Sequence, residues 1–173
     1  MKETLQDIRD RRSCRKYKDQ QITDAELNAV LDAAVWTPTG RGAQSPLMIV
    51  VQDKPTIEKL SKMNAAVMGT SSDPFYGAPT VVIVLADRDR PTWVEDGSLV
   101  MGTLMLAAHA VGIDSCWIHR AREVFDSEEG KAMLKSWGIE GNYGGVGHCI
   151  LGYAAEGGIA PAKPRKDGYV VRV

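Results

Sequence analysis

Thr80-Val81-Val82-Ile83-Val84-Leu85-Ala86 is the stretch that decides the fold class. Its residues are mostly β-branched, none is charged, and the run has the length of a strand. Further strand-like runs lie at 47–51, 115–118 and 146–153, and helical patterns separate all of these runs. The alternation predicts a single domain over residues 1–173, of the α/β or α+β class, in which helices cover a sheet in three layers.

The helices are predicted from their start and end signals. Thr4 with Asp7 and Thr23 with Glu26 form patterns like capping boxes, and Pro38 ends the helix that follows Thr23. Further helices are expected from Pro55 through Met63, from Val94 to Val111, and from Asp126 and Glu129 through Leu134, with Gly138 ending the last. The helix over 94–111 is apolar around most of its circumference. We therefore expect it to be buried on more than one side, either centrally or at a subunit contact.

The composition excludes several classes of protein. The chain has 173 residues and a formal net charge of −1, so we do not expect a nucleic-acid binder. The N-terminus lacks the apolar core of a signal peptide, and the longest apolar run, 99–113, is interrupted and too short to span a membrane. Three widely spaced cysteines do not suggest a disulfide framework and suit a reducing compartment. We expect a cytoplasmic protein with no membrane partner.

The segment Arg11-Arg12-Ser13-Cys14-Arg15-Lys16 is the first candidate site. In a helix Arg11 and Arg15 share a face, whereas in an extended segment Arg11, Ser13 and Arg15 share one. Either arrangement lets two guanidinium groups converge, and arginine binds phosphate or carboxylate through paired hydrogen bonds. The alternative is a helix C-terminus whose cations suit the helix dipole.

Two further segments are candidate ligand-binding loops. Pro38-Thr39-Gly40-Arg41-Gly42-Ala43-Gln44 contains glycines that let the backbone approach a ligand, although a plain connection between helix and strand is equally open. It lacks the Gly-Lys-Ser/Thr ending of a Walker loop. Lys163-Pro164-Arg165-Lys166 places cations on a stiff tail, for which a solvated tail is the alternative. The β-prone Tyr169-Val170-Val171 could add a strand to this sheet or to that of a partner.

The cysteines and histidines do not predict a metal site or a nucleophile. Cys116 and His119 would need His148 and Cys149 as further zinc ligands, but adjacent strand residues point to opposite faces and the usual zinc spacings are missing. Cys116 lies where a buried strand residue is expected, which argues against a Cys/His pair. Gly145-Val146-Gly147 is no dinucleotide fingerprint, because its third glycine is missing and a strand follows it.

Taken in order, these segments resemble the nitroreductase family of FMN-dependent oxidoreductases. The resemblance covers nearly the whole chain and is carried by the motifs Arg11-Arg12-Ser13-x-Arg15-Lys16-Tyr17, Pro38-Thr39-Gly40 with Gln44, Asp96, Cys116-Trp117-Ile118, Leu151-Gly152-Tyr153 and Lys163-Pro164-Arg165. It implies an α+β three-layer sandwich with a central, mostly antiparallel sheet flanked by helices. It also implies an intertwined homodimer that holds FMN at its interface and exchanges its C-terminal tails.

The resemblance further implies which residues bind the cofactor. The FMN phosphate would be held by Arg11, Ser13, Lys163 and Arg165, with Arg12 beside them, and Arg15 would face N1 and O2 of the ring. The cofactor would also be bound by Gln44 and, from the partner subunit, by Pro38, Thr39 and Gly40 of the same loop. Backbone at Ile118, His119 and Arg120 would meet O4 and N5, and Asn64 or Ser71 the pyrimidine edge. A cation near N1 would stabilise the reduced flavin, which is anionic there.

The activity that the resemblance implies is hydride transfer from NADH or NADPH through FMN to a small electron-poor acceptor, such as a nitroaromatic or a quinone, in a ping-pong reaction. No side chain is expected to be catalytic, because the cofactor carries the hydride. The alternatives are a non-catalytic flavin or nucleotide-phosphate binding module, and a reductive dehalogenase or flavin-consuming enzyme of the same fold. Three departures from the family pattern are Gly42, Ser45-Pro46, and His119-Arg120 at a position that is often Gly-Gly or Glu-Gly.

Overall fold

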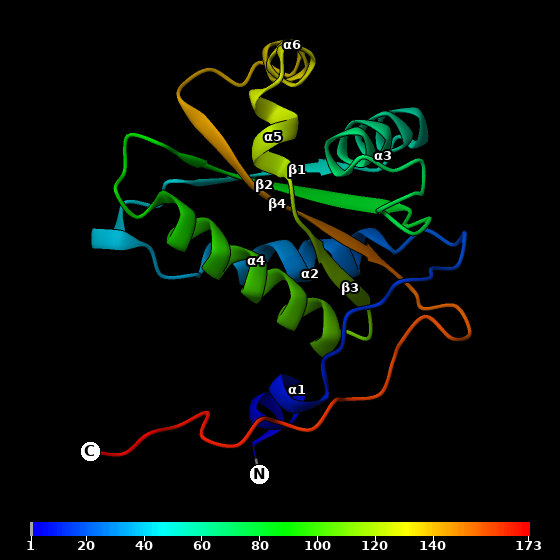
Figure 1. Ribbon diagram of the computed structural model, residues 1–173, viewed down its shortest axis with the longest axis vertical. Helices are drawn as coiled ribbons and strands as arrows, with labels where there is room; N and C mark the ends of the chain where they lie inside the picture. The colour runs from blue at the N-terminus through cyan, green and yellow to red at the C-terminus, as the bar shows by residue number, and fades with distance from the viewer. Residues whose placement is uncertain (1) are drawn as a thin grey trace.

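The computed structural model of the protein describes residues 2–173 and shows three layers (Figure 1). Within these residues, the middle layer is a four-stranded antiparallel sheet in the order β1-β2-β4-β3. Its strands are β1 (Pro46–Val51), β2 (Thr80–Asp87), β3 (Asp114–Ile118) and β4 (Tyr143–Gly152). One face is covered by α3 (Lys54–Met68), α5 (Ala121–Asp126) and α6 (Glu128–Ser136), and the other by α2 (Asp24–Val35) and α4 (Trp93–Ala110). The predicted sandwich with an antiparallel sheet is confirmed.

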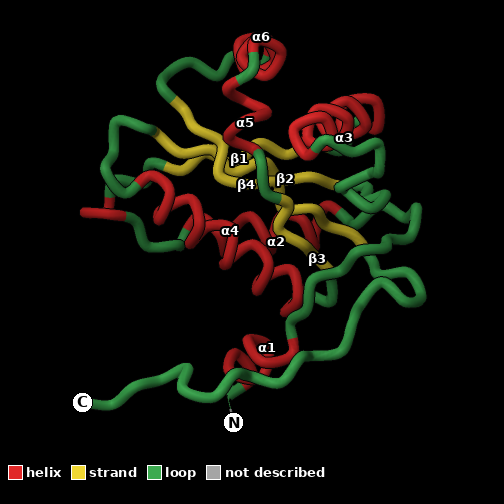
Figure 2. The backbone as a smooth tube through the Cα atoms, viewed as in Figure 1, coloured by secondary structure: helices red, strands yellow, loops and turns green. Residues whose placement is uncertain are grey.

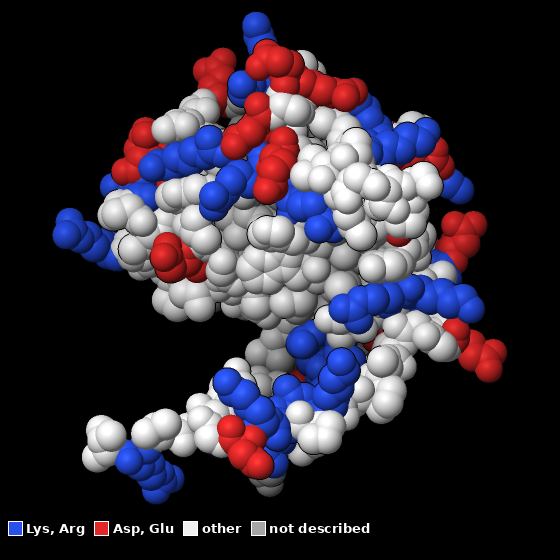
Figure 3. Space-filling view, in the orientation of Figure 1, with Lys and Arg blue, Asp and Glu red and all other residues white. Residues whose placement is uncertain are grey.

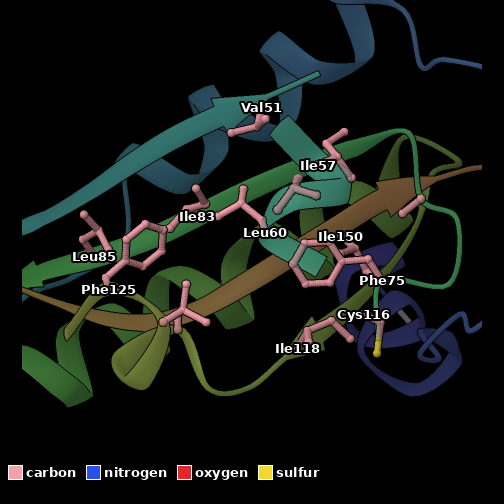
Figure 4. Packing of buried hydrophobic residues seen from close by; sticks show 14 of the residues in the cluster. Val51, Ile57, Leu60, Phe75, Ile83, Leu85, Cys116, Ile118, Phe125 and Ile150 are labelled. Carbon is pink, nitrogen blue, oxygen red and sulfur yellow. The ribbon is translucent and has the colours of Figure 1, made fainter. Parts of the chain in front are cut away.

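Strand β2 lies between β1 and β4 and belongs to both hydrophobic cores. Its residues Val81, Ile83 and Leu85 point toward the side of α3 and α5, while the alternate residues pack toward α2 and α4. Figure 4 shows Ile83 and Leu85 among Leu60, Phe125 and Ile150 on the first of these sides. The period of two along a strand therefore explains why every position from Val81 to Ala86 is apolar.

Most helix signals are confirmed at atomic level. The hydroxyl of Thr23 accepts a hydrogen bond from the backbone of Glu26, and the Glu26 carboxylate accepts one from the backbone of Thr23, so the capping box of α2 is complete. Asp53 caps α3 by accepting from Thr56, and Gly69 ends that helix in the left-handed conformation. A 3-10 turn, η1 (Gly40–Gly42), connects α2 to β1.

Two predicted helix starts are wrong. Helix α1 (Glu3–Asp10) begins after Lys2, and no side chain caps it, so Thr4 and Asp7 do not form a box. The helix expected from Asp126 is two helices, because the extended backbone of Ser127 ends α5 and its hydroxyl caps α6 by accepting from Gly130. Asp126 is the last residue of α5 and pairs with Arg88. Its carboxylate is therefore unavailable as a cap.

Strand β4 begins at Tyr143, three residues before its predicted start at Val146. Gly144 and Gly145 pair with Ala86 and Leu85 of β2, although glycine has a low strand propensity. A Cβ atom at Gly145 would lie 2.2 Å from the carbonyl oxygen of Ala121, at the start of α5. Glycine is thus required here because the helix layer approaches the sheet closely, which a propensity argument could not detect.

The outer surfaces of α4 and of the tail are left uncovered in the single chain. Helix α4 buries one side, while Leu99 on another side is 50% exposed. Tyr169, Val170 and Val171 are largely exposed and do not join the chain's own sheet, so that alternative is wrong, and a strand added to a partner's sheet stays a prediction (Figure 2). Among residues 2–173, no helix combines the length and the apolar character needed to cross a bilayer.

Candidate functional site

The segment Arg11–Lys16 is extended, so the helical alternative for it is wrong. The backbone N–H of Cys14 donates to the carbonyl oxygen of Ser115 on β3 at 2.9 Å, and that of Arg15 donates to Gly158 at 2.8 Å. The segment therefore runs between the edge of β3 and the start of the C-terminal tail. Cys14 is buried, and the residues on either side of it, Ser13 and Arg15, are turned away from the core.

The two neighbouring arginines of this segment have different roles. Arg12 donates from Nη1 to the carbonyl oxygens of Arg9 and Arg11, the latter at 2.8 Å, and so satisfies the C-terminus of α1. Arg12 therefore fits the alternative interpretation of this segment, in which the cations interact with the C-terminus of a helix. Arg11, by contrast, buries Nη1 without any hydrogen-bond partner within residues 2–173. Since a buried charged donor without a partner is costly, the chemistry of this guanidinium suits an anionic ligand.

The cationic tail lies at the same end of the molecule. Ile159 pairs with Cys14 in an isolated bridge, and Lys163 and Arg165 follow within a few residues. Arg165 donates to the carbonyl oxygen of Lys163 at 3.1 Å, and neither cation has an acidic partner in the described part of the chain. Figure 3 shows Lys and Arg side chains gathered on the arm formed by α1 and the tail, with a hollow between this arm and α4.

The loop over 38–44 is held by a buried carboxylate on α4. Asp96, which is 2% exposed, accepts from the backbone N–H of Gly40 at 2.8 Å and from the hydroxyls of Thr92 and Ser45. A Cβ atom at Gly40 would lie 2.3 Å from the Thr92 hydroxyl oxygen, so the loop approaches α4 at a position that only glycine fits. The loop is thus a fixed structure and not a loose connection.

The turn after β3 is fixed by Asn64 of α3. The side-chain amide of Asn64 donates to the carbonyl oxygen of His119 at 2.7 Å, and its oxygen accepts from Nε of Arg120 at 3.2 Å. Asn64 is fully buried, whereas His119 is exposed and Arg120 half-buried. Ile118 points into the core beside Cys116 (Figure 4). The side-chain contacts of Asn64 are therefore with the turn, which makes it a residue that positions the predicted ring-binding backbone.

A cavity of about 740 Å³ lies elsewhere, along α3 and the loop over 70–79. Ser71 lines this cavity, but the fourteen residues predicted to bind the cofactor do not. Its floor is apolar, with Ile57 and Phe75, and charged residues such as Lys62 and Asp73 stand around it. The basic segment and the loop over 38–44 are thus separate from the large cavity of the single chain.

The buried cysteines and the buried histidine belong to the core. Cys14, Cys116 and Cys149 are free and buried, and no group of three or more His, Cys, Asp or Glu side chains within residues 2–173 is placed to hold a metal ion. His148 is fully buried against the rings of Phe75 and Phe125, with ring centroids 5.1 and 5.9 Å away. Burial lowers its pKa to about 3, so this imidazole is neutral.

Comparison with known proteins assigns the family. A profile of the nitroreductase family matches residues 8–72 and 67–153 of this chain. The chain belongs to the nitroreductase family. A relative from Archaeoglobus fulgidus, with the provisional name NADH dehydrogenase/NAD(P)H nitroreductase, is 34% identical over 159 residues, which cover 88% of this chain and 86% of the relative.

Solved structures of nitroreductases have the same fold. A nitroreductase with bound FMN from Bacteroides fragilis is 30% identical, with a TM-score of 0.91 and complete coverage of both chains. A second one with bound FMN, from Desulfitobacterium hafniense, is 26% identical, with a TM-score of 0.89 and coverage of 100% of this chain and 99% of its own. The resemblance inferred from the sequence motifs is thus confirmed.

A single chain does not bring all the predicted binding residues together. The loop over 38–44 is tied to Asp96, near the N-terminal end of α4, whereas the Arg11–Arg15 segment is tied to Ser115, shortly after the other end of α4 (Figure 1). Helix α4 has 18 residues, which corresponds to roughly 27 Å at the α-helical rise. The two groups of residues therefore lie at opposite ends of this helix.

The sequence motifs included Asp96 but gave it no role. The structure shows that its carboxylate is the anchor of the loop over 38–44. The signal that could have revealed this role is an acidic residue in the first turn of a helix that is otherwise apolar. Such a residue also suits the helix dipole, so its partner could not be named without the tertiary structure.

Proposed function

We propose that this chain transfers a hydride from NADH or NADPH to a small electron-poor acceptor, such as a nitroaromatic or a quinone, with FMN as its cofactor. Membership of the nitroreductase family makes it an FMN-dependent oxidoreductase. The observation that carries the proposal is the buried Nη1 of Arg11, which has no partner among residues 2–173 and lies in the family's basic motif. A phosphate would supply the hydrogen-bond acceptors that this guanidinium lacks.

The residues of the basic arm suit an FMN phosphate. Arg11 and Ser13 would bind it together with Lys163 and Arg165, while Arg12 beside them caps α1. Arg15 is exposed next to Ser13 on the extended segment, where its charge would stabilise the negative charge of the reduced ring near N1. We assign the opposite ring edge to the backbone of 118–120, whose position Asn64 fixes.

When bound, FMN supplies the two-electron chemistry, accepting a hydride from NAD(P)H and passing it to the acceptor. The acceptor gains two electrons and two protons in all, of which solvent supplies one proton. Donor and acceptor would use one site in turn, in a ping-pong sequence. Within residues 2–173 the site that we propose contains no nucleophile, and the protein's part is to bind, orient and charge-stabilise the ring.

Features of the single chain support a homodimer with the site at its interface. The loop over 38–44 and the Arg11–Arg15 segment lie at opposite ends of α4. A second copy of the chain is therefore needed to bring Pro38, Thr39, Gly40 and Gln44 of its loop to the flavin ring that the first copy's basic segment binds. Strand β1 pairs on one side only within residues 2–173, and Leu99 of α4 and the tail residues 169–171 are exposed. A partner that covers these surfaces would remove an open sheet edge and exposed apolar groups.

The compartment follows from the thiols. All three cysteines are free and buried. Free thiols suit a reducing environment, and we propose the cytoplasm.

An absorbance spectrum of the purified protein, followed by anaerobic titration with NADH and NADPH, tests the proposal. We expect about one FMN per chain and complete bleaching by at least one of the two donors. Initial rates at several fixed acceptor concentrations should then give the parallel double-reciprocal lines of a ping-pong reaction. A protein that stays colourless in excess FMN contradicts the proposal. A yellow protein that neither donor bleaches is the non-catalytic binding module, and loss of intact FMN during turnover indicates the flavin-consuming alternative.

A further inference from the structure

We propose that Arg120 selects acceptors that carry a carboxylate, by offering its guanidinium fork beside the flavin ring. This inference rests on the proposed function, because it requires the ring to lie against the backbone of 118–120. It goes further by naming the chemical class of the acceptor and the side chain that recognises it.

The backbone of Arg120 is the first observation. Its φ of 73° and ψ of 13° place it in the left-handed region, directly after β3 and at the N-cap of α5, although it makes no side-chain cap. This conformation is unfavourable for a residue with a side chain, and such residues are held there by their surroundings, often at ligand sites. The arginine is therefore a costly choice whose side chain requires an explanation.

The side chain is held in place from α3. Nε of Arg120 donates to Oδ1 of Asn64, and the amide of Asn64 also fixes the carbonyl oxygen of His119. Because Asn64 is fully buried, its amide is a fixed anchor. The guanidinium of Arg120 is thereby directed along the end of α3, where Nη2 lies 3.2 Å from the sulfur of Met68.

The guanidinium N–H groups of Arg120 that have no strong acceptor determine which ligand it can bind. A guanidinium has five N–H donors, and only Nε has a strong acceptor here. The thioether of Met68 is a weak acceptor, and no carboxylate within residues 2–173 lies in ion-pair distance of Arg120. The end of the guanidinium, with Nη1 and Nη2, is the edge that fits the two oxygens of a carboxylate. A half-buried cation of this kind beside the ring favours an anionic acceptor over a neutral one.

The test compares two acceptors of similar size that differ in charge, 4-nitrobenzoate and 4-nitrobenzamide. FMN-loaded enzyme is reduced with one equivalent of dithionite under argon and mixed with each acceptor, and the rate of flavin reoxidation is recorded. This removes the anionic nicotinamide donor from the measurement. The variants are Arg120→Gly, which suits the left-handed backbone, and Arg120→Gln. Arg122→Gln is the matched control, because Arg122 is an exposed arginine that stacks on Trp93, with 4.9 Å between its Cζ and the ring centroid.

We expect both Arg120 variants to react about tenfold or more slowly with 4-nitrobenzoate, the loss of one charge-assisted contact. The 4-nitrobenzamide rate should fall by a clearly smaller factor, which measures any loss of ring positioning at Arg120, and Arg122→Gln should leave both rates unchanged. Because each rate is compared with wild type, the intrinsic reactivities of the acceptors cancel. As a readout without turnover, the Kd of benzoate for the oxidised holoenzyme should rise by the same factor, while that of benzamide should not.

Each result distinguishes this inference from the function on which it rests. A protein that binds no FMN overturns the proposed function. If the wild-type holoenzyme is reduced and reoxidised normally, but the Arg120 variants react more slowly with both acceptors by the same factor, or with neither, then only the role of Arg120 is overturned. If the variants instead change only the ratio of NADPH to NADH reduction rates, the guanidinium recognises a donor phosphate, and the carboxylate inference is wrong.

Discussion

The carboxylate of Asp96 accepts a hydrogen bond from the backbone N–H of Gly40 at 2.8 Å, across 56 residues of sequence. This contact joins the first turn of α4 to the loop that, in our proposal, contacts the flavin bound by the partner subunit. It also separates that loop from the basic segment, which is joined to the sheet near the other end of α4.

Replacing Asp96 should therefore disturb the protein's stability and its cofactor binding together. In Asp96→Ala the N–H of Gly40 and the hydroxyls of Thr92 and Ser45 lose a buried acceptor, which should lower the free energy of unfolding by about 1–3 kcal/mol. FMN affinity should fall about tenfold because the loop is released. Asp96→Asn keeps one acceptor for Gly40 and should lose less of both. Denaturant unfolding and flavin fluorescence measure the two effects, and wild-type values for Asp96→Ala would show that the contact is unimportant.

The phosphate site can be separated from the ring site with two ligands. Replacing Arg11 by Ala removes charge-assisted hydrogen bonds worth about 1.5–3 kcal/mol, so FMN should bind about tenfold to a hundredfold more weakly. Riboflavin lacks the phosphate, and its Kd should hardly change. Arg165→Ala should behave in the same way, whereas Arg9→Ala on the exposed side of α1 serves as the control.

The FMN effect should also become smaller at higher salt, because screening weakens partly exposed charge contacts. Fluorescence quenching of both ligands on each variant is the measurement. An equal loss of riboflavin affinity in Arg11→Ala would mean that this arginine supports the fold or the ring, and not the phosphate.

The C-terminal tail provides a test of the homodimer. Deleting Asp167–Val173 removes the apolar residues 169–171, which are about three-quarters exposed in the single chain. Sedimentation should show weaker dimerisation, and dialysis should release FMN faster, in the same variant. Replacing only Tyr169, Val170 and Val171 by serine keeps the length of the tail and should give the same two changes. A full dimer with retained flavin would leave the tail without a structural role.

The buried imidazole of His148 predicts sensitivity to acid. Because burial lowers its pKa in the folded state to about 3, the unfolded chain takes up a proton on this residue first as the pH falls. The stability that the neutral imidazole contributes is therefore complete above about pH 6.5 and is lost as the pH falls toward 3. One such group removes up to about 1.4 kcal/mol per pH unit in this range.

His148→Phe should reduce the pH dependence of stability between about pH 6 and pH 4, because phenylalanine does not titrate. Urea unfolding at a series of pH values gives the slope for wild type and variant, whatever their absolute stabilities are. His109→Gln, at the end of α4, is a control for a histidine outside the core. Identical slopes for wild type and His148→Phe would show that His148 is not responsible.

The amino-acid sequence determined the class of fold and the order of its elements, because local rules set both. The β-branched run over 80–86 specifies a strand, and the box at Thr23 and Glu26 specifies a helix start. The basic motif at 11–16 and the glycines at 40 and 42 stood out for the same reason, since their chemistry depends on residue type. The ordered set of motifs was enough to indicate the family.

Only the tertiary structure decided how these parts meet, because hydrogen bonds and packing between distant residues have no signature in local sequence. The hydrogen bond from Cys14 to Ser115 makes the basic segment extended. Arg12 caps a helix, while Nη1 of Arg11 has no partner within residues 2–173. Strand β4 begins with glycines because α5 approaches the sheet closely. Asn64, predicted as a ring contact, binds the carbonyl oxygen of His119 and the guanidinium of Arg120, and its contact with the ring stays a prediction. Its amide could be assigned only when α3 and the end of β3 were seen side by side.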